Sequence, residues 1–172
     1  MRVILFRHGP AGQHDAARWP DDGKRPLTKR GLERTARAAD GLRRFLGGAL
    51  RIVASPLERA RQTARIIGEA VAPGSRTEMI EALVPGAPIR ESLRWLKDLK
   101  SGTSVVLVGH EPHLGKLAGV LLFGSSGAAL PMKKAGALVI DFVGPVEPGA
   151  GRLYAFLPPR ALRQLARSKA RA

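Results

Sequence analysis

The chain has 172 residues, 44% of them hydrophobic and 25% charged, which is the size and balance of one globular domain spanning 1–172. It contains no cysteine, which excludes disulfides, thiolate catalysis and zinc sites built on cysteine. Lys and Arg outnumber Asp and Glu by 29 to 14, and the net charge of +15 favours acidic partners: phosphorylated substrates, nucleic acid or anionic lipid.

The chain begins with a short strand and a loop. Residues Arg2 to Phe6 are apolar and β-branched, which predicts a buried strand. The segment Gly9 to Pro26 is polar and punctuated by glycine and proline, which predicts a loop. Thr28 is the expected N-cap of a helix that ends at Gly47-Gly48. Apolar residues recur at helical spacing within it: Leu32, Ala36, Ala39, Leu42 and Leu46.

Strands and helices continue to alternate through the middle of the chain. Leu50 to Ala54 predicts a second strand. Ser55-Pro56 is expected to begin a helix that runs to about Val71, because proline is tolerated in a first turn. Thr77 to Ile80 predicts a short strand. Pro88 to Lys100 predicts a helix with Leu93, Leu96 and Leu99 on its inner side.

The last third holds the strongest strand and a hairpin. Ser104 to Val108 is continuously apolar, which indicates burial on both faces, as in a parallel sheet. A helix is expected over Leu114 to Phe123, and two antiparallel strands over Ala137 to Val143 and Leu153 to Leu157. A basic helix is expected over about 159–172. This order predicts an α/β fold: a three-layer α/β/α sandwich with a mostly parallel central sheet and a C-terminal antiparallel hairpin.

The sequence shows no segment that would target or anchor the chain to a membrane. The first apolar run, Val3 to Phe6, is too short for a secretory signal. The longest apolar region is interrupted at Gly124 to Gly127 and falls short of the ~20 residues that cross a bilayer. We therefore expect a cytoplasmic protein without membrane contact, and a monomer.

Residues suited to phosphate chemistry follow three of the expected strands. Arg7-His8-Gly9 follows the first, Ser55 to Thr63 follows the second, and Gly109-His110 follows the strongest. Ligands of open α/β sheets bind at the carboxyl ends of strands, so parallel neighbours would bring two histidines and at least two arginines together. Guanidinium groups bind phosphoryl oxygens, and a neutral imidazole can attack phosphorus.

Four motifs in this order resemble the histidine phosphatase superfamily, which includes the phosphoglycerate mutases: Arg7-His8-Gly9, Arg25 to Gly31, Ser55 to Ala64, and Gly109-His110. The short chain, with no long insertion before Gly109, is most similar to the SixA-type phosphohistidine phosphatases. The resemblance implies a phosphoglycerate mutase-like fold and a phosphatase that works through a covalent phosphohistidine intermediate, without metal or cofactor, on a phosphorylated protein.

The resemblance also implies a role for each matching residue. His8 would be the nucleophile, and Arg7, Arg59 and His110 would hold the phosphoryl group. Larger relatives place a glutamate general acid in mid-chain, and Glu81 is the nearest candidate by position. A departing imidazole titrates near neutrality and needs such an acid less than an alkoxide does. The lack of a clear general acid therefore fits a phosphoramidate substrate better than a sugar or alcohol ester.

Two other functions stay open. The same pocket would serve a phosphatase of small phosphomonoesters. A non-catalytic module that binds anions or nucleic acid would also explain the charge, although the scarcity of aromatic residues (5%) makes nucleic acid a weaker partner. The basic C-terminal helix is either a solvated face or a docking surface for an acidic protein.

Individual residues carry alternatives as well. Arg25 would either close over the phosphoryl pocket, as a further substrate-binding residue, or pair with Asp21 or Asp22. His113 is expected in the first turn of a helix rather than in the pocket. The intervening Pro112 argues against a metal site shared by the two histidines at 110 and 113. Three polar residues are expected to be solvated: His14, Arg61 and Arg65.

Overall fold

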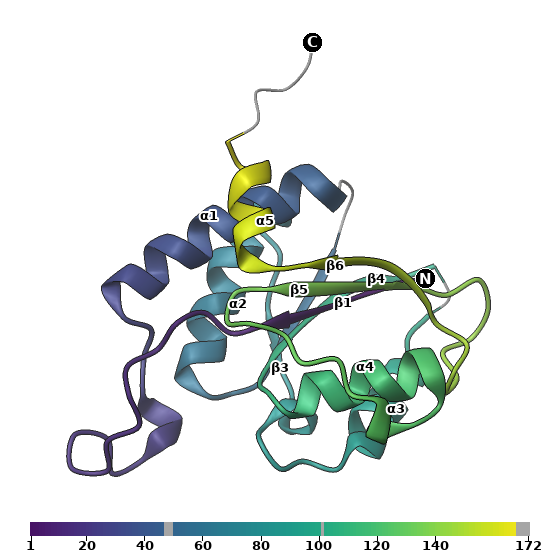
Figure 1. Ribbon diagram of the computed structural model, residues 1–172, viewed down its shortest axis with the longest axis horizontal. Helices are drawn as coiled ribbons and strands as arrows, with labels where there is room; N and C mark the ends of the chain where they lie inside the picture. Colours follow the sequence, from purple (N-terminus) through teal and green to yellow (C-terminus); the bar gives the residue numbers. More distant parts are fainter. Residues whose placement is uncertain (47–49, 101, 168–172) are drawn as a thin grey trace.

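The computed structural model describes residues 1–46, 50–100 and 102–167, and these build one six-stranded sheet (Figure 1). Its strands, in spatial order, are β3 (Glu78–Met79), β2 (Arg51–Ala54), β4 (Ser104–Gly109), β1 (Arg2–Arg7), β5 (Ala137–Asp141) and β6 (Arg152–Leu157). The first four in this order run parallel, whereas β5 is antiparallel to both β1 and β6. The prediction of a mostly parallel sheet with a C-terminal antiparallel hairpin is confirmed.

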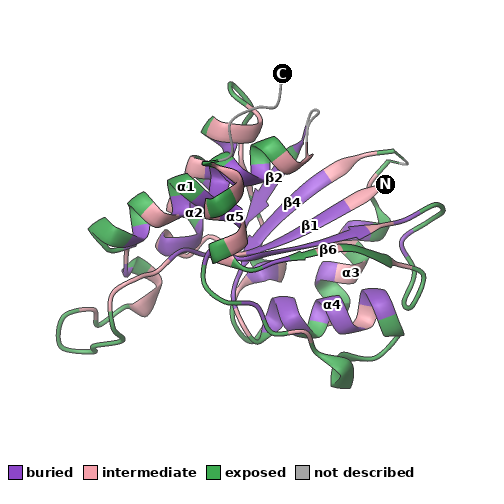
Figure 2. Cartoon of the chain, turned by 45° about the horizontal axis from the view of Figure 1, so that its top comes forward, coloured by how far each residue is buried: buried purple, intermediate pink, exposed green. Residues whose placement is uncertain are grey.

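Helices cover both faces of the sheet. On one face lie α1 (Lys29–Leu46), α2 (Glu58–Val71) and α5 (Pro159–Leu165); on the other lie α3 (Ile89–Lys97) and α4 (His113–Phe123) (Figure 1). Side chains of β1 alternate between the two cores: Ile4 and Phe6 pack against the first set of helices, and Val3 and Leu5 against the second. Both faces of the central strands are therefore buried (Figure 2). The predicted α/β/α sandwich is confirmed.

The first helix differs from its prediction in the face it buries. Thr28 does cap α1, since its Oγ1 accepts a hydrogen bond from the Gly31 N–H at 2.9 Å. The buried stripe consists of Gly31, Thr35, Ala38, Ala39, Gly41 and Leu42. Leu32 and Ala36 of the predicted apolar series are exposed. Small residues occupy the inner face because α1 packs closely on α2 and α5.

Helix boundaries differ at several ends. The second helix begins at Glu58, three residues after Ser55, and has no side-chain cap, because its N-cap position is held by the apolar Leu57. The third helix ends at Lys97, not Lys100. The predicted stop at 47–48 and the end of the predicted C-terminal helix, 168–172, lie outside the described residues. Of the helices that are described, none is long and apolar enough to cross a membrane.

Candidate active site

Two histidines meet at the carboxyl ends of neighbouring parallel strands. His8 follows β1 and His110 follows β4, and the two strands are paired so that Arg7 lies opposite Gly109. The two imidazole ring centroids are 5.0 Å apart, and the rings are tilted by 53°. Both side chains are buried. Sequence order alone separates them by a hundred residues, so the parallel pairing is what brings them together.

The hydrogen bond of His8 defines which ring nitrogen carries the proton. Nδ1 lies 2.7 Å from the carbonyl oxygen of Gly9. A carbonyl oxygen can only accept, so Nδ1 donates and Nε2 keeps its lone pair. Burial lowers the pKa of His8 to about 3, against the opposing effect of the Gly9 bond, and Arg59, Arg7 and Lys134 lower it further. Burial therefore contributes more to the neutral form of His8 than the neighbouring cations do.

The second histidine is fixed by a serine at the end of the next strand. His110 Nε2 lies 2.9 Å from the hydroxyl oxygen of Ser55, which follows β2 and is fully buried. Burial, followed by the neighbouring His8, lowers the pKa of His110 to about 3. The pocket therefore holds two neutral imidazoles whose cationic forms are disfavoured by their surroundings.

Two arginines lie beside these rings, each with a buried Nε that donates to no atom of the described chain. Arg7, the last residue of β1, donates from Nη1 to the carbonyl oxygen of Met132 at 2.7 Å. Arg59 lies in the first turn of α2 and donates from Nη1 to the backbone oxygen of Asp22 at 2.8 Å. Unpartnered buried N–H groups are unfavourable, and an anion with several acceptor oxygens would satisfy them. The site is thus suited to a phosphoryl group.

The loop between β1 and α1 links a third arginine to the site through one carboxylate. Asp22 Oδ1 accepts from Arg25 Nε at 2.6 Å, and its Oδ2 lies 3.1 Å from Arg59 Nη2. The Arg25 hydrogen bond, with added attraction from Arg59, lowers the pKa of Asp22. Of the two predicted partners, Arg25 therefore pairs with Asp22, whereas Asp21 accepts from the Gly23 N–H at the start of the η1 turn (Asp22–Lys24).

Sequence reasoning missed a basic residue on the loop before β5. The N–H of Ala135 lies 3.1 Å from the Arg7 oxygen and 3.2 Å from the His8 oxygen, which places Lys134 beside His8. Burial lowers the pKa of Lys134, and three arginines (Arg7, Arg25 and Arg59) lower it further. A signal was available, since a basic pair precedes a strand that is antiparallel to β1 and so begins where β1 ends.

Glu111 was also missed, and it holds the same loop in place. Its Oε1 accepts from the Met132 N–H at 3.0 Å, while the Met132 carbonyl accepts from Arg7. Burial raises the pKa of Glu111. The side chain of Glu111 therefore fixes the backbone of Met132, and Met132 in turn holds the guanidinium group of Arg7.

The remaining candidates lie outside this cluster or at its margin. His113 is buried in the first turn of α4, as expected, and its Nε2 lies 2.8 Å from Ser92 Oγ in α3. Glu81 is exposed in the η2 turn (Glu81–Leu83). His14, Arg61 and Arg65 are solvated, as predicted. Within the described ranges, no group of three or more His, Cys, Asp or Glu residues is arranged to hold a metal ion.

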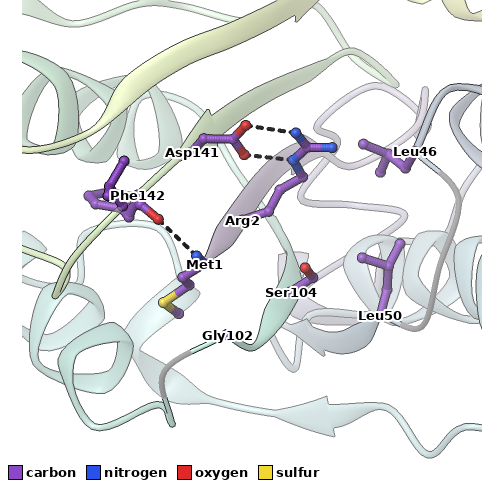
Figure 3. Close-up of a pocket in the computed structure, with 9 residues that line it drawn as sticks. Met1, Arg2, Leu46, Leu50, Gly102, Ser104, Asp141 and Phe142 are labelled. Carbon is purple, nitrogen blue, oxygen red and sulfur yellow. Dashed lines mark hydrogen bonds and ion pairs between the residues drawn. The ribbon is translucent and has the colours of Figure 1, made fainter.

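The opposite edge of the sheet provides a contrast. A cavity of about 420 Å³ lies there beside Met1, Arg2 and Asp141 (Figure 3). Arg2 is already bonded to both carboxylate oxygens of Asp141, at 2.6 and 2.7 Å, and the terminal amine donates to the Phe142 oxygen at 2.8 Å. Among the described residues of this cavity, Arg2 and Asp141 already pair with each other, so they offer less to an external anion than the arginines at the carboxyl edge do.

Comparison with known proteins finds histidine phosphatases among the relatives in sequence and in structure. The model of the histidine phosphatase superfamily (branch 1) matches residues 3–83. An uncharacterized protein from Picosynechococcus sp. is 37% identical over 157 residues, 90% of each chain. Phosphohistidine phosphatase SixA from Escherichia coli is 30% identical over 128 residues, 73% of this chain and 77% of that protein. A solved structure of the protein histidine phosphatase SixA complexed with tungstate has a TM-score of 0.81 and 26% identity, and covers 94% of this chain and 99% of that chain.

Proposed function

The chain belongs to the histidine phosphatase superfamily and to its SixA-type members, and from this we propose that it hydrolyses phosphohistidine on a protein through a covalent intermediate at His8. The observation that carries the proposal is the meeting of His8 and His110, 5.0 Å apart, with Arg7 and Arg59 beside them. A neutral nucleophile among fixed cations is the arrangement that phosphoryl transfer requires.

In the first step, Nε2 of His8 forms a bond to phosphorus while the bond from phosphorus to the substrate imidazole breaks. The bonding electron pair stays on the departing nitrogen, which takes a proton from water. Arg7, Arg59 and His110 would hold the phosphoryl oxygens and stabilise the charge that they carry during transfer. Because these guanidinium groups supply the positive charge, the proposed reaction uses no metal ion.

In the second step, a water oxygen bonds to phosphorus as the bond to His8 Nε2 breaks. The electron pair returns to the imidazole, the proton of the water passes to solvent, and inorganic phosphate leaves. The Gly9 carbonyl keeps the proton on Nδ1 throughout, so the ring is ready for another cycle.

Hydrolysis of small phosphomonoesters is the second candidate, and the position of η2 supports it. The N–H of Ile80 donates to the oxygen of Ala54 at the end of β2, so Glu81 begins its turn at the same edge of the sheet as Ser55. An alkoxide leaving group requires a proton donor more than imidazole does. Glu81→Gln should therefore lower ester turnover and leave phosphoramidate turnover unchanged if Glu81 is that donor.

The decisive test is replacement of the nucleophile. His8→Ala should lose phosphate release from a phosphohistidine protein and from p-nitrophenyl phosphate by at least about a thousandfold, since the covalent path is removed. Wild-type protein, quenched in base during turnover, should carry radiolabelled phosphate, and His8→Ala should carry none. His14→Asn, at an exposed loop histidine, is the matched control and should remain active. Undiminished turnover by His8→Ala would refute the proposal, and rate loss in EDTA would refute its metal independence.

A further inference from the structure

A hollow of about 280 Å³ between α1 and α5 is lined almost entirely by arginine. Arg37 comes from α1, Arg160 and Arg163 come from α5, and Arg167 follows α5 by two residues. Gln164 completes the lining. The hollow is separate from the cluster around His8 and shares no residue with it.

These arginines lack the acidic partners that other arginines of the chain have. Arg2, Arg51 and Arg61, for example, each pair with a carboxylate. None of the four in the hollow forms an ion pair with an acid of the described residues. Burial lowers the pKa of Arg163, and nearby Arg34, Arg37 and Arg167 lower it further. Like charges crowded in this way repel one another, and an external anion would relieve the repulsion.

The backbone beneath the hollow is closely packed. Leu162 of α5 is fully buried, and its carbonyl oxygen comes so close to Gly41 of α1 that a Cβ at this glycine would lie 1.9 Å away. The two helices therefore meet backbone to backbone (Figure 1). Arginines that extend from fixed backbone lose less conformational freedom on binding than arginines on a mobile tail.

The helix α5, which supplies Arg160 and Arg163 to the hollow, begins at the edge of the sheet where His8 lies. At that edge Leu157 of β6 pairs with Ala137 of β5, and Ala137 pairs with Phe6, two residues before His8. The loop that carries Lys134 also adjoins α5, because a Cβ at Gly136 would lie 3.3 Å from Pro159 Cδ. A macromolecule positioned at His8 thus has the beginning of α5 beside it.

We infer that this hollow, the arginine hollow, docks an acidic segment of the phosphorylated protein whose phosphohistidine enters the His8 site. The inference rests on the proposed function. Guanidinium forks match carboxylates in geometry and charge. Of the described residues that line the hollow, none is aromatic and able to stack on bases, so a peptide rich in Asp and Glu fits it better than nucleic acid does.

The kinetic test uses two phosphohistidine peptides that differ only in a flanking tail, Glu-rich or Gln-rich. Wild-type protein should have a kcat/KM about tenfold higher for the Glu tail at low salt, and the preference should shrink as salt screens the charges. Arg160→Gln with Arg163→Gln should abolish the preference. Arg90→Gln with Arg94→Gln removes the same charge from exposed positions on α3 and should retain it. A preference equal in all three proteins would overturn the inference.

A binding experiment separates this inference from the catalytic proposal. A fluorescent Glu-rich peptide without phosphate should bind wild-type protein and bind the Arg160 and Arg163 double variant several-fold more weakly, even if phosphohistidine hydrolysis fails. Equal binding would count against the hollow. A single-stranded oligonucleotide that binds tighter than the peptide, and loses its affinity in the double variant, would assign the hollow to nucleic acid and overturn the choice of partner.

Discussion

Lys134 lies outside the sequence motifs and brings a further positive charge to the site. It lies between Met132, which accepts from Arg7, and Ala135, which donates to the backbone oxygens of Arg7 and His8. Ala135 has a φ of 59°, a left-handed conformation that is strained for alanine. The chain holds this turn at a cost, and the turn places the Lys134 ammonium near His8.

We therefore predict that Lys134→Gln lowers kcat/KM for phosphohistidine by about tenfold or more, because a cation near the transferring oxygens is removed. Lys133→Gln is the matched control, since it deletes the same charge from the preceding position, which is exposed as Lys134 is. Steady-state kinetics on both variants provide the measurement. Equal losses in the two would mean that only general charge matters and that Lys134 has no particular place in the site.

Two helical glycines show how the packing between elements decides whether a Gly→Ala substitution raises or lowers the free energy of unfolding. In α1, a Cβ at Gly41 would lie 1.9 Å from the Leu162 oxygen, a backbone atom that cannot move aside without shifting α5. In α2, a Cβ at Gly68 would lie 3.9 Å from Thr77 Oγ1 and 4.0 Å from Ile52 Cγ1, which are ordinary contacts. The two substitutions share their chemistry and differ only in available space.

Gly41→Ala should lower the free energy of unfolding by about 1–3 kcal/mol through overpacking. Gly68→Ala should raise it by about 0.5–1 kcal/mol, because alanine restricts the unfolded chain and favours helix. Urea denaturation of both variants tests the pair. If Gly41→Ala also raised the free energy of unfolding, the close approach of α1 and α5 would be wrong.

At the scale of the whole molecule, the two buried histidines make global stability depend on pH. The pKa of each is about 3 in the folded state and about 6.5 as an ordinary value. Between these limits the unfolded chain binds more protons, so stability is fully present above about 6.5 and falls as pH decreases toward 3. His8→Asn should reduce the slope of unfolding free energy between pH 5 and 6 by roughly 1 kcal/mol per pH unit.

Urea denaturation in phosphate-free buffer measures this slope, since a bound anion would favour the charged rings. His110→Asn should have a similar effect, and His14→Asn serves as the control at an exposed histidine. A His8→Asn variant with the wild-type slope would show that His8 is not held neutral by burial.

The sequence predicted the layers of the fold, and it predicted that His8 and His110 would meet, because both follow from the order of strands and helices along the chain. Alternating strands and helices indicated the layers, and residues directly after parallel strands, such as His8 and His110, must share one edge. Lys134 was missed because its position depends on which strand pairs with β1 and in which direction, and Glu111 was missed because its contact with Met132 depends on the same loop. The sequence left open which aspartate pairs with Arg25, because the choice depends on the loop geometry that turns Asp22, and not Asp21, toward it.

The partner of His8 Nδ1 has a consequence for the charge inside the pocket. Many catalytic histidines are oriented by a carboxylate, whereas here a neutral main-chain oxygen of the next residue does so. An acidic partner would be a stronger acceptor, but it would repel an incoming dianion. Because the acceptor belongs to the peptide unit, no side-chain substitution removes it directly, and the orientation of the ring depends on the backbone at residues 8 and 9.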